Sequence, residues 1–257
     1  MEFEGAGARV VALADVTMEV RENSFVSIVG PSGCGKSTLF SIAAGIIEPS
    51  YGEVYLDGKR VERRTEYVSY MLQKDLLLPW RMILDNVILG LEIGGVPKRE
   101  ARERARALFG RYGLQGFENH YPHQLSGGMR QRAALMRTLL LDRPLVLLDE
   151  PFGALDALTR SLMQEWLLQI WEGSQRTVVF ITHDIEEAIF LSDQIYVMSA
   201  RPGHMKARVD VNLPRPRSIA SHTDARFVAL KDHLLHLVRE ESLRAFEQQG
   251  SGVFAGA

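Results

Sequence analysis

The sequence is poor in several features that define whole classes of protein. It holds one cysteine, Cys34, so it has no internal disulfide, and we expect the chain to work in a reducing compartment. No run of about 18 residues lacks charge, which excludes a membrane-spanning helix and leaves any membrane role to a partner. Met1–Arg9 has no apolar stretch, so we expect no signal peptide.

A surplus of basic charge is also missing. The 30 Lys and Arg residues nearly balance the 32 Asp and Glu residues. This balance gives no support for a nucleic-acid partner, which usually requires a basic surplus. What the chain does have is length and apolar content: 257 residues, 46% of them hydrophobic, are enough for one large domain or two small ones with a substantial core.

A glycine-rich turn between an apolar run and a helical pattern is the most informative stretch. It follows Phe25–Val29, fits the phosphate-binding pattern G-x-x-x-x-G-K-[ST], and consists of Gly30, Pro31, Ser32, Gly33, Cys34, Gly35, Lys36, Ser37 and Thr38. We call residues 30–38 the phosphate loop. Glycines let successive N–H groups point inward, and the following helix adds the positive end of its dipole. Lys36 would reach the β- and γ-phosphates, and the Ser37 hydroxyl would hold Mg²⁺. The alternative, a turn that binds nothing, is disfavoured by the strand before it and the helix after it.

Apolar runs alternate with helical patterns along the rest of the chain. The runs that predict strands are Val10–Val20, Gly52–Gly58, Tyr67–Met71, Leu145–Leu148, Thr177–Ile181 and Gln194–Met198. Helical patterns cover Leu76 to Arg143, Leu155–Trp171 and Asp184–Ser192; Leu213–Arg217 is typical of a linker, and an amphipathic helix follows over Phe227–Val238. The alternation predicts an α/β fold with parallel strands and a helical insertion.

Polar residues follow two of the expected parallel strands. Asp149 and Glu150 end the run Leu145–Leu148, and His183 follows Thr177–Ile181. Ligands bind beyond the carboxyl ends of such strands, where the phosphate loop also lies. Asp149 is therefore placed to bind Mg²⁺ through water, Glu150 to orient or deprotonate an attacking water, and His183 to donate a hydrogen bond to a γ-phosphate. The alternatives are a helix cap or ion pair for the carboxylates and a structural role for the histidine.

Two further segments each allow two interpretations. Ser126, Gly127 and Gly128 precede a helical pattern, so they form either a plain N-cap or an anion site built from free N–H groups, the hydroxyl and the helix dipole. Gln73 ends a strand just before Leu76–Trp80, which is either a buried loop or an exposed apolar patch that docks a partner.

Taken together, these segments resemble the ATP-binding subunit of ATP-binding cassette (ABC) transporters over nearly the whole chain. By this resemblance the phosphate loop is the Walker A motif, Leu145–Asp149 is Walker B, Glu150 is the catalytic glutamate, Gln73 is the Q-loop glutamine, Leu125–Met129 is the family signature, Ala154–Asp156 is the D-loop, and His183 is the switch histidine. The resemblance implies a P-loop NTPase: a RecA-like core with an antiparallel β subdomain (residues 1–75 and 144–213), an inserted α-helical subdomain (76–143) and a C-terminal helical tail (214–257).

The resemblance also implies a mechanism and partners. ATP and Mg²⁺ would be the cofactors, with Ser37, Gln73 and Asp149 around the ion. In a homodimer, the signature of one copy would close on the γ-phosphate held by the other, Asp156 would help to bind nucleotide, and hydrolysis would reopen the pair. Transmembrane permease subunits would dock around residues 76–86, which makes the chain peripheral, at the cytoplasmic face of the inner membrane. An extracytoplasmic solute-binding protein would be an indirect partner.

Within the family, three segments are similar to the bacterial importer group for nitrate, sulfonates, taurine and related small solutes. They are Leu77–Trp80, Asp149–Asp156 and Met198–Gly203. One departure concerns the start of the chain, because members usually begin with another strand and an aromatic residue that stacks on adenine, and this chain begins at about that point. Phe3 is the only aromatic residue before Phe25, so we assign the stacking role to it.

Two other functions use related machinery. Soluble ATPases of DNA repair and translation share the ATPase unit, but they usually carry two cassettes or a long coiled-coil insertion, and this chain has neither. A nucleotide-binding module without hydrolysis is the second alternative, and the presence of Glu150 and His183 argues against it.

Overall fold

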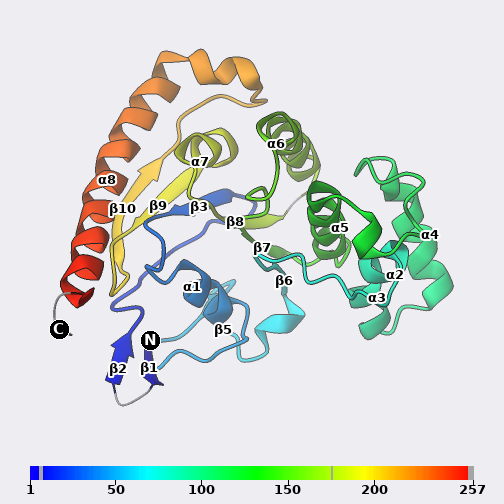
Figure 1. Cartoon of the computed structure of the whole chain (residues 1–257), viewed down its shortest axis with the longest axis horizontal. Coiled ribbons are helices and arrows are strands. Elements are labelled where there is room, and N and C mark those ends of the chain that lie inside the picture. Colours follow the sequence, from blue (N-terminus) through cyan, green and yellow to red (C-terminus); the bar gives the residue numbers. More distant parts are fainter. Residues whose placement is uncertain (6–7, 175, 254–257) are drawn as a thin grey trace.

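A mixed six-stranded sheet forms the centre of the molecule (Figure 1). The computed structural model describes residues 1–5, 8–174 and 176–253, with side chains described for residues 1–3, 10–174 and 176–248. The strands lie in the order β10-β9-β3-β8-β7-β6. They are β3 Phe25–Val29, β6 Val68–Met71, β7 Leu145–Asp149, β8 Thr177–Ile181, β9 Gln194–Met198 and β10 Met205–Asp210. Neighbours pair in parallel except the edge strand β10, which is antiparallel to β9.

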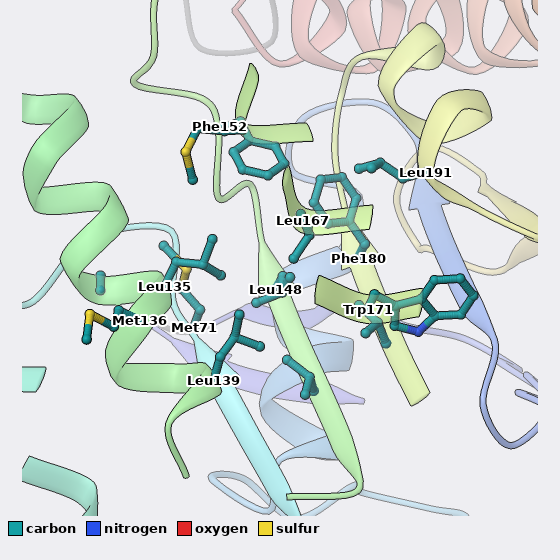
Figure 2. Packing of buried hydrophobic residues seen from close by; sticks show 14 of the residues in the cluster. Met71, Leu135, Met136, Leu139, Leu148, Phe152, Leu167, Trp171, Phe180 and Leu191 are labelled. Atoms are coloured by element: carbon teal, nitrogen blue, oxygen red, sulfur yellow. The ribbon is translucent and has the colours of Figure 1, made fainter. Parts of the chain in front are cut away.

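Successive residues of the central strands alternate between two buried cores, one on each face of the sheet. Phe25 and Val29 of β3 belong to the larger core, whereas Val26 and Ile28 belong to the smaller one. Burial on both faces is why these strands are continuous apolar runs in the sequence. Helices α5 (Gly127–Leu139), α6 (Ala157–Glu172) and α7 (Ile185–Leu191) cover the larger core, and α1 (Lys36–Ala43) covers the smaller one (Figure 1). Figure 2 shows the larger core, where Leu148 and Phe180 from the sheet lie among side chains of α5 and α6.

The segment between residues 76 and 143 is helical, as the sequence predicts. Its helices are α2 (Ile83–Val87), α3 (Leu89–Ile93), α4 (Lys98–Phe109) and α5, with a short 3-10 turn η2 (Pro122–Gln124) before α5. α2, α3 and α4 lie to one side of the sheet (Figure 1). The strand predicted within Gly52–Gly58 is the short β4 (Tyr55–Leu56), which forms a hairpin with β5 (Lys59–Arg60) through Asp57-Gly58; a 3-10 turn, η1 (Arg64–Glu66), follows.

The expected strand over Val10–Val20 is wrong for most of its length. A short hairpin forms instead, with β1 (Glu2–Gly5) paired to β2 (Ala8–Val11). Beyond β2, Leu13 makes only a single bridge to Gly203. The left-handed backbone of Asp15, with φ of 50°, interrupts the extended conformation, and the apolar residues after it pack on the smaller core without pairing.

The C-terminal part differs from expectation in two respects. Strand β10 was not predicted, and residues 213–217 are packed rather than a free linker: the Arg217 guanidinium is buried and donates to the carbonyls of Ile189, Phe190 and Ser192. The predicted amphipathic helix is confirmed and extended as α8 (Ala225–Val253), after a 3-10 turn η3 (Ile219–Thr223). Residues 254–257 of the predicted tail lie outside the described residues. Within the described part of the chain, no helix has the length and apolar character needed to span a bilayer.

Candidate active site

The carboxyl ends of four parallel strands bring the predicted site residues to one edge of the sheet. The phosphate loop follows β3, Glu150 follows β7, His183 comes two residues after β8, and Gln73 comes two residues after β6. Asp149, the last residue of β7, is paired in register with Ile181, the last residue of β8. The topology therefore gathers segments that are up to 153 residues apart in the chain, counted from Gly30 to His183.

Backbone geometry in the phosphate loop depends on its glycines. Gly33 and Gly35 have φ of 75° and 107°, the left-handed region in which a side chain would be strained. A Cβ on Gly35 would also lie 2.6 Å from the Leu13 side chain. Helix α1 then begins at Lys36, directly after the loop, so its free N–H groups and dipole face the space that the loop encloses.

The Lys36 ammonium lies inside the loop. Its side chain is 8% exposed, and Nζ donates to the carbonyl oxygens of Gly30 at 2.8 Å and Pro31 at 2.9 Å. The third donor of the ammonium contacts Cys34 Sγ at 3.8 Å, and because sulfur is a weak acceptor a phosphate oxygen can replace it. The two carbonyl contacts hold the Lys36 ammonium in place inside the loop before nucleotide binds. Binding therefore costs less side-chain entropy than it would with a mobile lysine.

Asp149 is the buried carboxylate of the site. It is 3% exposed, and burial raises its pKa, while a hydrogen bond with Ser37 acts in the opposite direction. The Tyr70 hydroxyl lies 3.5 Å from its Oδ2, and burial raises the pKa of that phenol to about 12. A hydroxyl and a carboxylate side by side are the hard oxygen donors that Mg²⁺ prefers alongside phosphate oxygens. The residues present therefore fit a magnesium ion held through Ser37 and Asp149, which would neutralise phosphate charge there.

Three predicted catalytic residues meet at one carboxylate oxygen. Glu150 Oε2 accepts a hydrogen bond from Gln73 Nε2 at 3.2 Å and lies 3.3 Å from His183 Nδ1. Glu150 itself has a left-handed backbone, with φ of 48°, held by its N–H donating to Ile181 O at 2.9 Å. A non-glycine residue in that conformation is strained, and such strain is concentrated at functional sites. The side chain of Glu150 is 20% exposed and that of His183 64%, so a water molecule can reach this group from solvent.

The signature and D-loop residues lie apart from this group. Ser126 caps α5 by accepting from Met129 N at 3.3 Å, and Asp156 caps α6 by accepting from Thr159 N at 3.0 Å. Both capping residues are exposed, and Gly127 and Gly128 form the first turn of α5. Among the described residues, no hydrogen bond or ion pair joins Ser126, Gly127, Gly128 or Asp156 to the phosphate loop or to Glu150. The N-cap interpretation of Ser126 is therefore correct, and the same geometry leaves its anion-binding role open.

Phe3 lies on β1, opposite Val10 of β2, and is 41% exposed. In the part of the chain with described side chains, it makes no ring contact with another aromatic residue. The stacking role assigned to it stays a prediction.

Two supporting groups were missed in the sequence. Tyr70 sits beside Asp149, and Glu187 of α7, 5% exposed, bonds to Thr182, the residue before His183, and to Gln164 of α6 at 2.9 Å. Burial raises the pKa of Glu187. Tyr70 could have been predicted from its place near the end of a strand next to β7. No sequence feature indicated Glu187, because its burial depends on how α6 and α7 pack.

Comparison with known proteins agrees with this geometry. The family model for the ABC transporter matches residues 13–153. The uncharacterized ABC transporter ATP-binding protein MJ0412 of Methanocaldococcus jannaschii is 46% identical over 245 residues, which cover 95% of this chain and 91% of that protein. The taurine import ATP-binding protein TauB of Rhizobium johnstonii is 46% identical over 235 residues, covering 91% of this chain and 88% of TauB.

A solved structure has the same fold. The dimeric post-hydrolysis state of the ATP-binding cassette MJ0796, bound to ADP and Pi, superposes with a TM-score of 0.75 at 32% identity and covers 83% of this chain and 96% of that one. The agreement in sequence and in fold extends over most of the length. This chain therefore belongs to the ATP-hydrolysing, ATP-binding subunits of ABC transporters.

Proposed function

We propose that this chain is the energy-coupling ATPase of a bacterial importer for taurine or a related small solute, such as another sulfonate or nitrate. The observation that carries the cargo class is the 46% identity to a protein named for taurine import. In this proposal the chain works at the cytoplasmic face of the inner membrane, bound to transmembrane permease subunits. An extracytoplasmic solute-binding protein delivers the solute to these subunits.

The site residues have separate roles in this proposal. The phosphate loop binds the nucleotide phosphates, and Ser37, Asp149 and Gln73 surround Mg²⁺. Glu150 takes a proton from the attacking water, Gln73 and His183 orient Glu150, and His183 donates a hydrogen bond to the γ-phosphate. The contacts of both residues with Glu150 Oε2 support these roles, because a base must be held within hydrogen-bond reach of its water. The division into core, helical subdomain 76–143 and tail 214–257 belongs to the same proposal.

We infer that the complete site contains two copies of the chain. Ser126–Gly128 of one copy would close on the γ-phosphate held by the other, and hydrolysis would reopen the pair. The dimeric, ADP- and Pi-bound structure of MJ0796 supports this inference. So do two exposed leucines in the first turns of α6, Leu158 at 72% and Leu162 at 57%, since apolar side chains that one copy leaves in water beside Asp156 suit an interface.

The permease would dock on the loop after Gln73. Leu76 and Trp80 are 51% and 72% exposed there, while Asn86 holds the loop through Leu78 N and through three carbonyl oxygens. We expect Trp80→Ala to lower permease co-purification about tenfold, because an aromatic side chain that becomes buried in an interface contributes strongly to binding. ATP turnover of the isolated subunit should change little. Tyr51→Ala, at a 79% exposed aromatic residue elsewhere on the surface, is the control. Equal losses in both variants would contradict a specific docking site.

Reconstitution tests the function as a whole. The chain and the permease that co-purifies with it are placed in vesicles with MgATP inside, and uptake of labelled taurine, an alkanesulfonate and nitrate is measured with the solute-binding protein outside. We expect uptake of one of these solutes, and its loss with Glu150→Gln. Co-purification with ribosomes or DNA instead of membranes would overturn the importer and favour a soluble ATPase.

A further inference from the structure

The turn between β9 and β10 packs against the outside of the phosphate loop. A Cβ on Gly203 would lie only 2.0 Å from the carbonyl oxygen of Cys34, so the two backbones are in direct contact and only glycine fits. The same residue donates from its N–H to Ala12 O at 3.0 Å, and its carbonyl accepts from Ala14 N at 3.0 Å. The loop is therefore enclosed from behind by two segments that no part of the proposed chemistry uses.

Arg201, in this turn, donates two hydrogen bonds to a single loop carbonyl. Its Nε and Nη2 lie 3.2 Å and 2.9 Å from Gly33 O. That carbonyl shares a peptide unit with Cys34 N–H, and a trans peptide directs the two groups to opposite sides. Cys34 N–H accordingly points toward Pro31 O, across the loop, at 3.4 Å. A guanidinium on the outer carbonyl polarises this peptide and fixes its plane, so the Cys34 N–H is held across the loop toward Pro31 O.

Helix α8 holds the turn from its other side. Glu241 is 1% exposed, and its Oε2 accepts from the backbone N–H of Ala200, next to Arg201, at 2.9 Å. Its Oε1 pairs with Lys206 of β10 at 2.9 Å and with Arg244 one turn later. Lys206 also pairs with Glu240 at 2.6 Å, so the contact that depends on Glu241 alone is the Ala200 N–H, which would be left buried without an acceptor.

We propose that Arg201 and Glu241 are positioning residues for nucleotide binding: Glu241 fixes the turn, and Arg201 holds Gly33–Cys34 in the conformation that accepts phosphate. The C-terminal helix thereby sets the affinity of a loop more than 200 residues earlier in the chain, counted from Gly33 to Glu241. The proposal rests on ATP binding at the phosphate loop, and it needs neither the cargo nor the dimer.

The only cysteine of the chain, Cys34, is a built-in reporter of this conformation. It lies in the loop and is 1% exposed, so a thiol reagent reaches it only when the loop opens. The experiment measures the labelling rate of Cys34 without nucleotide and the Kd for MgATP, in the full chain and in Arg201→Ala, Arg201→Lys and Glu241→Gln. Arg208→Ala is the matched control, since Arg208 is an exposed arginine of the same hairpin that pairs with Asp210 and not with the loop.

We expect Arg201→Ala to raise both the labelling rate and the Kd about three- to tenfold, the range for losing hydrogen bonds from a partly solvated charge. Arg201→Lys should resemble it, because an ammonium keeps the charge but loses the planar fork. Turnover at saturating ATP should change by less than about twofold, since Arg201 touches no reacting atom. Glu241→Gln should shift both quantities the same way, and adding it to Arg201→Ala should have little further effect because both act through one contact.

Three results would overturn the proposal. If Arg201→Ala has the labelling rate and the MgATP affinity of the wild type, the loop does not need Arg201 to hold its conformation. Full rescue by Arg201→Lys would assign the effect to charge near the nucleotide instead of to the two hydrogen bonds. An equal effect in Arg208→Ala would reduce it to general electrostatics. A wild-type chain that fails to bind MgATP would instead refute the nucleotide-binding role itself, and the labelling measurement would still decide whether Arg201 closes the loop.

Discussion

Two regions of the molecule are expected to face nucleotide, and they differ in how complete they are. At the edge of the sheet, Gln73 and His183 converge on Glu150 Oε2 at 3.2 Å and 3.3 Å, beside the buried Asp149 and the buried Lys36. At the tip of α5, Ser126 is exposed, and its described side-chain hydrogen bond is made within its own helix. In the first region the predicted catalytic residues already contact one another within one chain, whereas the second presents donors outward.

The difference teaches how the chain divides binding from catalysis. The sheet edge is rigid because its residues end buried strands, so one copy can hold a nucleotide. Helix α5 is tied instead to the loop after Gln73: near its tip Arg130 Nε donates to Asp75 Oδ2 at 3.1 Å, and in its last turn Arg137 donates to the carbonyls of Asp75 and Leu76. A displacement of Gln73 by nucleotide therefore has a direct mechanical route to the signature helix, which is the part that another copy would contact.

The largest effect is expected for Glu150, because the catalytic role of the sheet edge depends on this one side chain. Glu150→Gln keeps the shape of the side chain but cannot take a proton, so turnover should fall about 10²- to 10⁴-fold while MgATP still binds. Phosphate release and nucleotide affinity are measured together. Glu22→Gln, at an exposed residue in the turn before β3, is the control and should leave both unchanged. Equal turnover in wild type and Glu150→Gln would remove Glu150 as the base and with it the claim that the sheet edge is complete.

Mixing two inactive variants tests whether the α5 tip completes a site in another copy. Lys36→Ala removes the phosphate contact, and Ser126→Arg blocks the tip; each alone should be nearly inactive. In a mixed pair, one of the two sites combines an intact loop with an intact tip, and only half of the pairs are mixed. Turnover should therefore recover to about a quarter of the wild-type rate, as a two-fold symmetric assembly requires. If the mixture stays as inactive as its components, the two regions do not meet across copies.

Sequence patterns alone predicted the elements that position the catalytic side. The phosphate loop, β6, β7 and β8 came from local chemistry, namely glycines at fixed spacing and apolar runs covered on both faces. Polar residues directly after such strands then had to meet at one edge, which is why the proximity of Glu150 and His183 could be anticipated, whereas the place of Gln73 in the site came from the family resemblance.

Elements whose structure depends on distant packing were harder to predict. In β10, Met205, Ala207 and Val209 alternate with polar residues, a half-buried edge pattern that was present but overlooked beside Pro202 and Gly203. The residues after Asp15 alternate between apolar and polar side chains as a strand does, yet they make separate apolar contacts with the smaller core and pair with no strand. Arg217 lies in a proline-rich stretch that indicated a linker, and only the fold shows three carbonyls converging on its guanidinium. Long-range partners of this kind leave no local signature.

The smallest expected effect concerns Glu187, the buried residue that bonds to Thr182 beside His183. Burial raises the pKa of Glu187 above 4.5, so between that value and the raised one the folded chain keeps a proton that the unfolded chain has lost. Unfolding then releases a proton, and stability falls as pH rises through this window by at most about 1.4 kcal/mol per pH unit. Glu187→Gln removes the titration, and its amide can still accept from Gln164 and donate to Thr182. The variant should therefore gain stability over wild type as pH rises, measured by urea unfolding from pH 4 to pH 8.

Glu186→Gln, at the neighbouring residue, gives the opposite sign and serves as the control. A hydrogen bond from Lys231 lowers the pKa of Glu186, so its contribution to stability is present above its ordinary pKa of 4.5 and is lost as pH falls through the lowered value. Its replacement should cost stability at neutral pH and nothing in strong acid. Because both variants make the same chemical change on one helix, a shared sign would show that the slope comes from overall charge. Opposite signs would assign it to the buried contact that fixes Thr182 and, through it, the position of His183.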